Sequence, residues 1–552
     1  MMGRKLRPRR DFRIVIGVMA ALVMGAPQVR AQRAGSEWPR YGGDGGNQRY
    51  SPLTQVTAAN VHHLVLRQLF QTGTAKISGF QASPIVTGGR MYVSTPYDNV
   101  IAYNLSTMRE QWRYEAKLGS WISCCGPVNR GVAVAGGSVF IASLDARVIA
   151  LDAATGDERW TVQDSDPDSA YAFTTAPQVT GDLVIVGTAG AEYPTRGRLT
   201  AYDIRTGERR WRWFAVPSPE EGGWWGTWAT KTASGEDLGR DIAREKADSA
   251  RYADGWRIGG GAVWTTPAYD STFGLLYFGT GNPVPEYDAS VRPGDNLYTS
   301  SLVALEAATG KVRWYHQYSP HDRWDYDVPN PPVLATLGGR AIVTQATKSG
   351  WVFVFDAKTG TLIRRSAPIV PQEKLWAPPT RDSVLRAPGA VGGANWYPDA
   401  YSPVLHRLFV PAMHEPMKDY TAEETPERGR VYRLGGEALV PKLPVWSVLS
   451  AVDIATGRIA WSHKGQVTAA PAHGGALATA GGLVFLGEDT GWFRALDART
   501  GKVLWEFYAG ATINAPPIAF SVGGEEFIAV AAGGDFYSGG YGDGILIFGL
   551  PK

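Results

Sequence analysis

The sequence predicts an all-β protein, an eight-bladed β-propeller, from a repeated turn phrase, short apolar strands between glycines, and a content of 66 glycines and 20 tryptophans. The phrase consists of an apolar pair, an acidic residue, two variable positions, Thr-Gly, three variable positions and Trp. Its full copies end at Trp160, Trp211, Trp314, Trp461 and Trp505. Degenerate copies end at Trp112 and Arg364, and a segment that ends at Phe70 makes an eighth. About eight copies predict about eight blades of four strands each.

The chemistry of the phrase predicts a hairpin. Asp, Thr and Gly in this order form a turn, because the polar side chains bond to their own backbone and glycine accepts a positive φ. The strands before the turns, such as Leu183–Val186 and Leu483–Leu486, are too short for helices. Neighbouring copies lie roughly 42 to 51 residues apart, with gaps of about 100 residues before Trp314 and Trp461 that must hold insertions. Separate β-sandwich domains are the alternative, but they need linkers that the sequence lacks.

One insertion is expected around residues 214–257. It includes a charged stretch from Gly239 to Arg251, for which we expect a helix. Three tryptophans lie nearby, Trp224, Trp225 and Trp228. Two interpretations of them stay open: they border a binding cleft, or they pack a long loop onto the propeller.

The N-terminus predicts export. Residues 1–31 combine a basic start, an apolar run from Ile14 to Ala26 and the small-residue cleavage pattern Val29-Arg30-Ala31, which is typical of a signal peptide. Arg9-Arg10 also resembles a twin-arginine signal, so Sec and Tat export both stay open. No later apolar stretch is long enough to cross a bilayer, so we expect residues 32–552 to form a soluble periplasmic protein. The net charge of +3 gives no electrostatic footprint for nucleic acid.

The two cysteines of the chain are neighbours, Cys124 and Cys125. A trans peptide holds neighbouring Cα atoms about 3.8 Å apart, closer than the usual disulfide range of about 4.4–6.8 Å, so a bond between them is strained. An exported chain meets an oxidising compartment, which favours the bond over the alternative of two reduced thiols.

Four oxygen-bearing residues predict a metal site: Glu192, Asn282, Asp325 and Asp327. Carboxylate and amide oxygens are the ligands that Ca²⁺-like cations require. Each residue follows or ends a strand in a different part of the repeat, so a propeller could direct all of them at its axis. Three carboxylates gathered without a cation would have to take up protons, because like charges at close range raise pKa. Isolated surface carboxylates are the alternative.

Five segments in order along the chain carry a resemblance to a known family: Cys124–Gly131, Gly190–Glu192, Gly259–Trp264, Gly279–Pro283 and Trp324–Asp327. Their sequences, order and spacing resemble the methanol/ethanol family of PQQ-dependent dehydrogenases. The resemblance covers essentially residues 37–549, including the Trp-docking turns of the repeat.

The resemblance implies that pyrroloquinoline quinone (PQQ) lies between the Cys124–Cys125 disulfide and the indole of Trp264, because an aromatic floor suits a flat quinone. It implies cationic donors at Arg130 and Lys348. It implies further contacts around the rim of the cofactor from Thr174, Gly190, Ala191 and Asn395.

Two positions depart from the pattern of the family. Gln81 stands where the family commonly has a carboxylate, so that rim contact must differ. Lys348 stands where many relatives have Arg, and it offers a point charge without the guanidinium fork.

The resemblance also implies a mechanism. Asp325 is the expected general base for the hydroxyl proton of a small alcohol, whose carbon delivers a hydride to C5 of the quinone. The metal is the expected Lewis acid on the C5 carbonyl, and Lys348 stabilises the charge that develops on its oxygen. Because the chain has no Cys-x-x-Cys-His sequence for covalent haem, the expected electron acceptor is a separate soluble cytochrome c.

Asp327 bears on the identity of the metal. In the family, a second aspartate two positions after the catalytic one marks lanthanide enzymes, whereas calcium enzymes have a small or uncharged residue there. This chain reads Asp325-Tyr326-Asp327, so a lanthanide(III) ion is expected and Ca²⁺ is the alternative. A trivalent ion gains more from a third carboxylate than a divalent ion does. In the other interpretation, Asp327 turns toward solvent or Arg323.

Two other functions stay open. One is a non-catalytic propeller scaffold, which would need neither the neighbouring cysteines nor the carboxylate set. The other is a PQQ-dependent dehydrogenase for sugars or polyols. The sequence leaves open the chain length of the substrate and the oligomeric state, a homodimer included.

Overall fold

The computed structural model describes residues 36–74, 79–440, 443–467, 473–534 and 541–552. Residues Gly35–Lys552 form one compact unit. The predicted signal peptide, residues 1–31, lies outside the described residues. Among the residues that are described, no helix combines the length and apolar character needed to span a bilayer.

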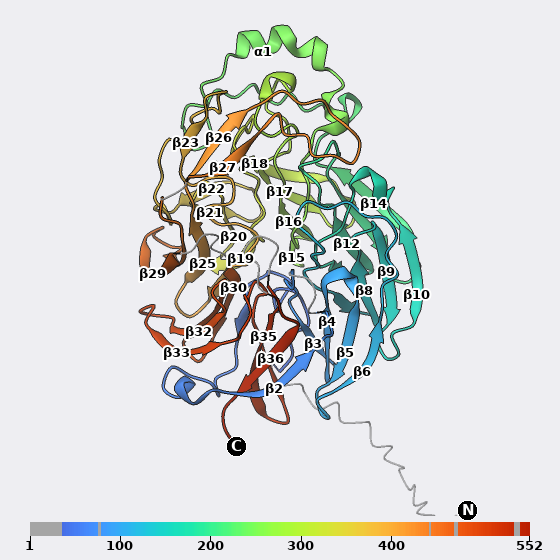
Figure 1. Ribbon diagram of the computed structural model, residues 1–552, viewed down its shortest axis with the longest axis vertical. Coiled ribbons are helices and arrows are strands. Elements are labelled where there is room, and N and C mark those ends of the chain that lie inside the picture. Colours follow the sequence, from blue (N-terminus) through green and yellow to red (C-terminus); the bar gives the residue numbers. More distant parts are fainter. Residues whose placement is uncertain (1–35, 75–78, 441–442, 468–472, 535–540) are drawn as a thin grey trace, which may run out of the picture. The chain divides into compact units, whose positions relative to one another are not determined.

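The described chain is almost entirely β-structure, and its sheets stand side by side around a central axis, as in a β-propeller (Figure 1). Five four-stranded antiparallel sheets follow one another along the chain. The first two are β3 (Ile85–Thr87), β4 (Arg90–Ser94), β5 (Val100–Asn104) and β6 (Arg109–Tyr114), then β7 (Ala133–Ala135), β8 (Ser138–Ala142), β9 (Arg147–Asp152) and β10 (Glu158–Gln163). The third is β11 (Gln178–Thr180), β12 (Leu183–Gly187), β13 (Arg198–Asp203) and β14 (Arg209–Phe214). The next two are β15 (Ala268–Asp270), β16 (Leu275–Gly279), β17 (Ser301–Glu306) and β18 (Val312–Gln317), then β19 (Val333–Leu337), β20 (Arg340–Ala346), β21 (Val352–Asp356) and β22 (Leu362–Arg365).

The C-terminal sheets recruit strands from the beginning of the chain. One is β24 (Ala400–Ser402), β25 (Arg407–His414), β28 (Trp446–Asp453) and β29 (Ile459–Val467). The next has five strands, β1 (Tyr50–Ser51), β30 (His473–Thr479), β31 (Leu483–Glu488), β32 (Trp492–Asp497) and β33 (Val503–Tyr508), with β1 parallel to β30. The last is β2 (Val65–Gln71), β36 (Gly544–Gly549), β35 (Glu525–Ala532) and β34 (Ile518–Val522). Pairing of β2 with β36 joins the two ends of the described chain in one sheet.

The tryptophans of the repeated phrase connect neighbouring sheets. The indole N–H of Trp112, on β6, donates to the carbonyl of Ala153, which follows β9 in the next sheet, at 3.2 Å. The same contact recurs from Trp160 to Ile204 at 3.1 Å. The indole of Trp112 also packs on Gly156, where a Cβ atom would lie only 2.7 Å from the ring. Glycine is required at this turn because φ is +83° and the ring leaves no room for a side chain.

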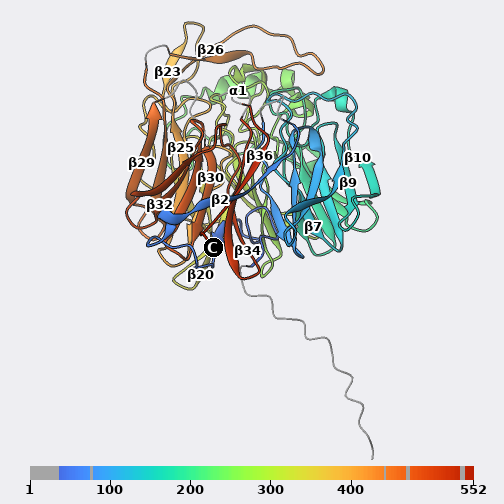
Figure 2. The ribbon, with the colours of Figure 1, turned by 60° about the horizontal axis from the view of Figure 1, so that its bottom comes forward.

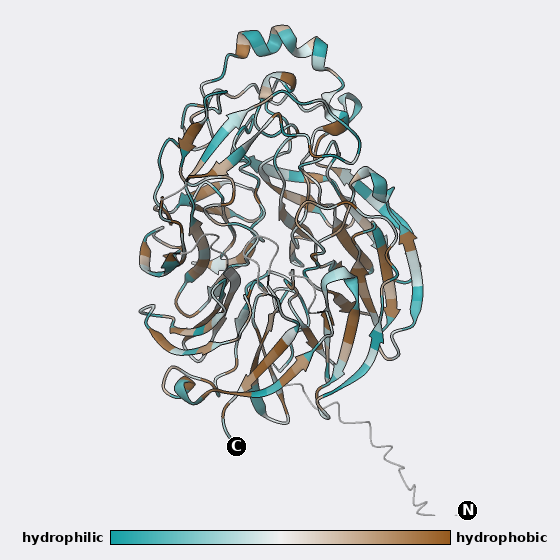
Figure 3. Cartoon of the chain, in the orientation of Figure 1, coloured by the Kyte–Doolittle hydropathy of each residue, from teal (hydrophilic) through white to brown (hydrophobic). Residues whose placement is uncertain are grey.

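Burial separates the inner from the outer strands. Every residue of β8 is buried, whereas β10, the outer strand of the same sheet, alternates between exposed and half-buried positions. Figure 3 shows the same division, with hydrophobic residues on the inner strands and hydrophilic ones on β10. Inner strands are apolar on both faces because sheets pack against them from both sides.

The long connection between β14 and β15 contains the expected helix in shortened form. Helix α1 covers Ile242–Asp248, and a 3₁₀ turn over Ser249–Tyr252 continues it. In the same connection Trp224 is buried, while Trp225 and Trp228 stack on each other with ring centroids 5.7 Å apart.

A small three-stranded sheet, here called the cap sheet, is inserted within the connections that flank β24 and β25. It consists of β23 (Val384–Arg386), β26 (Met417–Thr421) and β27 (Gly435–Leu439). Figure 2 shows β23 and β26 beyond the ends of the surrounding sheets, on the side where α1 lies. The cap sheet therefore lies at the same end of the surrounding sheets as α1.

Candidate active site

One cavity is bordered by β27 of the cap sheet, through Glu437. Its walls are formed by Gln81, Cys125, Arg130, Glu192, Trp264, Asp325, Asp327, Lys348, Ala390, Val391, Asn395, Trp396, Arg433 and Glu437. A second, smaller cavity is lined by Cys124, Thr174, Gly190 and Ala191 among others, and it shares Cys125, Arg130, Glu192 and Trp264 with the first. The two cavities thus adjoin and bring together all but one of the residues that the sequence predicts.

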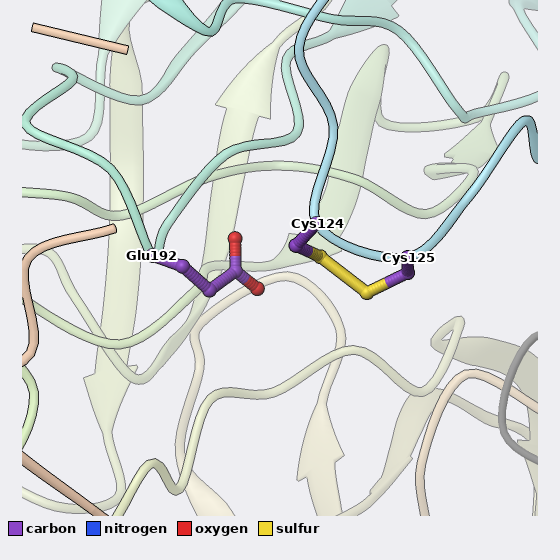
Figure 4. Close-up of side chains that lie close together, drawn as sticks. All are labelled: Cys124, Cys125 and Glu192. Atoms are coloured by element: carbon purple, nitrogen blue, oxygen red, sulfur yellow. A yellow bond between two sulfur atoms is a disulfide. The ribbon is translucent and has the colours of Figure 1, made fainter. Parts of the chain in front are cut away.

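The neighbouring cysteines form a disulfide in the wall of this site. Cys124 and Cys125 are bonded to each other, which confirms the prediction from the sequence. The carboxylate of Glu192 points toward them (Figure 4), and one of its oxygens and the two sulfur atoms lie within 4.8 Å of one another. The bonded pair presents an uncharged sulfur surface next to a carboxylate.

Arg130 and Trp264 contribute a cation and an aromatic ring to the same cavity. The guanidinium carbon of Arg130 lies 4.9 Å from the ring centroid of Trp264, and its Nη1 donates to Thr174 Oγ1 at 2.8 Å. Burial lowers the pKa of Arg130 to about 10, which still leaves the side chain charged at neutral pH. Its buried Nε has no hydrogen-bond partner among the described residues, so it remains available to a ligand.

Asp325, Asp327 and Lys348 form a compact ionic group. Lys348 Nζ lies 3.3 Å from Asp325 Oδ1 and forms an ion pair with Asp327. Trp264 Nε1 donates to the other oxygen of Asp327 at 2.9 Å. Asp327 therefore faces the cavity, whereas Arg323 donates to the backbone carbonyl of Leu238.

Asp325 has an unusual backbone. Its φ is +54°, in the left-handed region that non-glycine residues rarely adopt. The Nζ atom of Lys348 also donates to the backbone carbonyl of Asp325 at 2.9 Å. Strained backbone of this kind persists only when the surroundings hold it in place, and it is concentrated at functional sites.

Burial dominates the electrostatics of the acidic residues. It raises the pKa of Glu192, and it raises the pKa of Asp325 well above the usual range despite the opposing charge of Lys348. Burial by itself would lower the pKa of Lys348, but the ion pairs with Asp325 and Asp327 outweigh it and raise the pKa. Glu192 Oε2 is buried with no hydrogen-bond partner in the described structure.

These observations fit a bound cation. Glu192, Asp325 and Asp327 line one cavity, although their carboxylate oxygens do not all lie within 4.8 Å of one another. Within the described residues, Lys348 is the only cation ion-paired to any of them. A further positive charge would remove the cost of ionising the buried acids. Oxygen donors of this kind suit a hard cation.

Two of the residues that the sequence singled out contribute differently. Asn282 is buried and donates from its amide nitrogen to the carbonyl of Pro283 at 3.2 Å, and it lines neither cavity. Gln81 does line the larger cavity, and its buried Oε1 has no hydrogen-bond partner within the described ranges. Gln81 is thus placed to accept a hydrogen bond from a ligand.

Three other wall residues were not predicted from the sequence: Trp396, Arg433 and Glu437. They belong to the insertions that carry the cap sheet, outside the repeated phrase and outside the family segments. The only signal was the gap of about 100 residues before Trp461, which indicated an insertion but not its chemistry.

A comparison with known protein families decides the class of this site. The family described as the β-propeller domain of glucose, ethanol and alcohol dehydrogenases with PQQ matches residues 38–372 and 364–528. The chain belongs to the PQQ-dependent alcohol dehydrogenases. It is an all-β propeller enzyme.

Individual relatives agree with this assignment. The quinohemoprotein alcohol dehydrogenase ADH IIB of Pseudomonas putida is 34% identical, over 93% of this chain and 76% of its own length. The lanthanide-dependent methanol dehydrogenase of Methylacidiphilum fumariolicum is 31% identical, over 94% of this chain and 88% of its own. Among solved structures, a europium-containing methanol dehydrogenase superposes with a TM-score of 0.82 at 28% identity, covering 94% of this chain and 99% of that chain.

Proposed function

We propose that this PQQ-dependent dehydrogenase oxidises a small alcohol to an aldehyde in the periplasm, uses a bound lanthanide(III) ion, and passes its electrons to a soluble cytochrome c. The observation that carries the proposal is the convergence of Glu192, Asp325 and Asp327 on a cavity that also holds Lys348 and Trp264. A non-catalytic scaffold would not need this arrangement, and the relatives are alcohol dehydrogenases by name.

The two faces of the site would hold the cofactor. The Cys124–Cys125 disulfide and the indole of Trp264 both line the smaller cavity and provide two surfaces for a flat ring system. The unpartnered Nε of Arg130 would bind a carboxylate of PQQ. Polar groups of Thr174, Gly190, Ala191 and Asn395 would complete the rim.

The metal would be held by Glu192, Asp325 and Asp327. Asn282 stays a candidate ligand through its amide oxygen, because its nitrogen is the atom engaged with Pro283. Three carboxylates balance a trivalent ion, whereas a divalent ion would leave the ligand set with a net negative charge. This charge argument and the lanthanide-dependent relative favour a lanthanide over Ca²⁺.

When bound, PQQ supplies a two-electron acceptor and the metal ion supplies a Lewis acid at its reactive carbonyl. Asp325 would remove the hydroxyl proton of the alcohol, since it is a carboxylate in the wall of the cavity. Lys348 would hold Asp325 and Asp327 in place and stabilise negative charge on the reacting oxygen. The cap sheet would restrict access of water to these groups.

The scaffold of the site would be an eight-bladed propeller. The seven four-stranded sheets and the single five-stranded sheet of the described chain correspond in number to eight blades. The tryptophan contacts between neighbouring sheets, such as Trp112 to Ala153, would be the docking contacts of these blades.

A substrate panel tests the proposal. The purified protein would be reconstituted with PQQ and La³⁺, and reduction of a dye or of cytochrome c would be followed with ethanol, 1-propanol and glucose. We expect turnover of the alcohols and little or none of glucose. Turnover of glucose alone would favour a sugar dehydrogenase, and no turnover of any compound by protein that has bound PQQ would reject the proposal.

A further inference from the structure

The outer wall of the cavity carries an ionic pair, Arg433 and Glu437, that the general mechanism does not use. Glu437 lies on β27 of the cap sheet and Arg433 lies just before that strand. Both line the same cavity as the reacting group Asp325. Among the described residues that line this cavity, the only small aliphatic ones are Ala390 and Val391.

The pair is held rigidly from behind. Nη1 of Arg433 donates to both carboxylate oxygens of Glu437, at 3.0 and 3.2 Å. The fully buried Tyr287 donates its hydroxyl to Glu437 as well. On the other side, Nε of Arg433 lies 3.2 Å from a carboxyl oxygen of the buried Glu286, without hydrogen-bond geometry. The side chains of Arg433 and Glu437 nevertheless keep 26% and 18% exposure, and both residues line the cavity.

The charges of this wall are balanced. Glu286 is completely buried, and burial raises its pKa well above the usual range, which favours its neutral form. Arg433 and Glu437 then neutralise each other. A balanced pair of this kind has no net charge with which to select a cationic or anionic substrate. It still offers an acceptor and donors to a neutral polar group.

An alkyl chain and a hydroxylated chain would meet this wall differently. An alkyl chain would displace water from Glu437 and Arg433 without replacing the lost hydrogen bonds, which costs free energy. A second hydroxyl group would donate to Glu437 and accept from Arg433. Because the pair is already fixed by Tyr287 and Glu286, little side-chain entropy is lost on binding.

Resting on the proposed function, we propose that Arg433 and Glu437 select alcohols that bear a second hydroxyl group, namely small diols and polyols. The pair binds the second hydroxyl while Asp325 takes the proton of the reacting one. Glu437 and Arg433 are therefore specificity-determining residues for the reaction.

The test compares 1,2-propanediol and glycerol with 1-propanol in the reconstituted holoenzyme. We expect a higher kcat/KM for the hydroxylated substrates. In Glu437→Leu, kcat/KM for the diol should fall roughly ten- to a hundredfold, the usual effect of losing a hydrogen bond to a charged group. The value for 1-propanol should fall by a smaller factor, so the ratio of diol to propanol activity is the quantity that tests the role of Glu437.

The exposed ion pair Arg381–Glu423 provides a matched control. Glu423→Leu removes a carboxylate that does not line the cavity, and it should leave the ratio of diol to propanol activity unchanged. Melting temperature and PQQ absorbance show whether Glu437→Leu is folded and loaded. If it is not, Glu437→Gln replaces it and should lower the same ratio by a smaller factor.

The outcomes separate the two proposals. Oxidation of 1-propanol at least as efficient as that of the diols in the wild type, or an unchanged ratio in a folded Glu437 variant, overturns the inference but leaves the proposed function intact. Failure to oxidise any alcohol overturns the proposed function itself.

Discussion

The contacts between neighbouring sheets, here called seams, and the active-site cavity use the polar groups of their side chains in different ways. At a seam, Trp112 donates to a backbone carbonyl and packs on Gly156, so its polar group is satisfied inside the fold. In the cavity, Trp264 donates to the carboxylate of Asp327, while atoms of Arg130 and Glu192 stay buried without partners in the described chain. Because buried polar atoms are normally paired, the unpaired atoms of Arg130 and Glu192 are placed to meet a ligand in the cavity, whereas the indole N–H of Trp112 is already satisfied.

The largest expected effect is a loss of catalytic rate in Asp325→Asn, a substitution in the cavity that leaves the seams intact. Asp325→Asn retains an oxygen for the metal but cannot accept the substrate proton. We expect kcat to fall roughly 10²- to 10⁴-fold, the usual cost of losing a general base, with unchanged PQQ binding and melting temperature. Steady-state kinetics at saturating alcohol checks this. A near-normal kcat would show that another residue is the base.

The next largest expected effect is a loss of stability in Trp112→Ala, a substitution at a seam that leaves the cavity intact. Trp112→Ala removes a buried indole and its hydrogen bond, and should lower the free energy of unfolding by about 3–5 kcal/mol. The control is Trp228→Ala in the β14–β15 connection, which loses a stacked pair with Trp225 worth about 0.5–1.5 kcal/mol. Chemical denaturation followed by far-UV circular dichroism measures both. Equal losses would contradict the assignment of the seams as the stabilising element.

A smaller effect concerns the choice of metal. Asp327→Ala removes one of three carboxylates that would bind the metal. Residues that only orient the ligands already change metal affinity by roughly 10- to 100-fold, so loss of a ligand should lower activity with La³⁺ at least roughly tenfold. The exposed Asp254 supplies the control, since Asp254→Ala should leave activity unchanged. Titration of metal-free enzyme with La³⁺ and with Ca²⁺ provides the measurement. An intact lanthanide response in Asp327→Ala would place Asp327 outside the metal site.

The same contrast explains how far the sequence could predict the molecule. The seams are encoded locally, since turn, strand and tryptophan recur within one phrase, and the structure contains the corresponding sheets and indole contacts. The disulfide of Cys124 and Cys125 is local too. The position of Glu437 is not, because β27 pairs with β26 across a long loop and its orientation depends on tertiary packing. Asn282 shows the same limit: its segment was recognised, but the direction of its amide depends on Pro283.

The central claim is that the cavity binds PQQ through a metal held by its carboxylates. The most direct measurement titrates apo-protein with PQQ, followed by cofactor absorbance, with La³⁺ and with a chelator. We predict tight, saturable binding with La³⁺ and much weaker binding under chelation, and Glu192→Gln should weaken the La³⁺-dependent binding. Equally tight binding of PQQ with and without metal would contradict the claim.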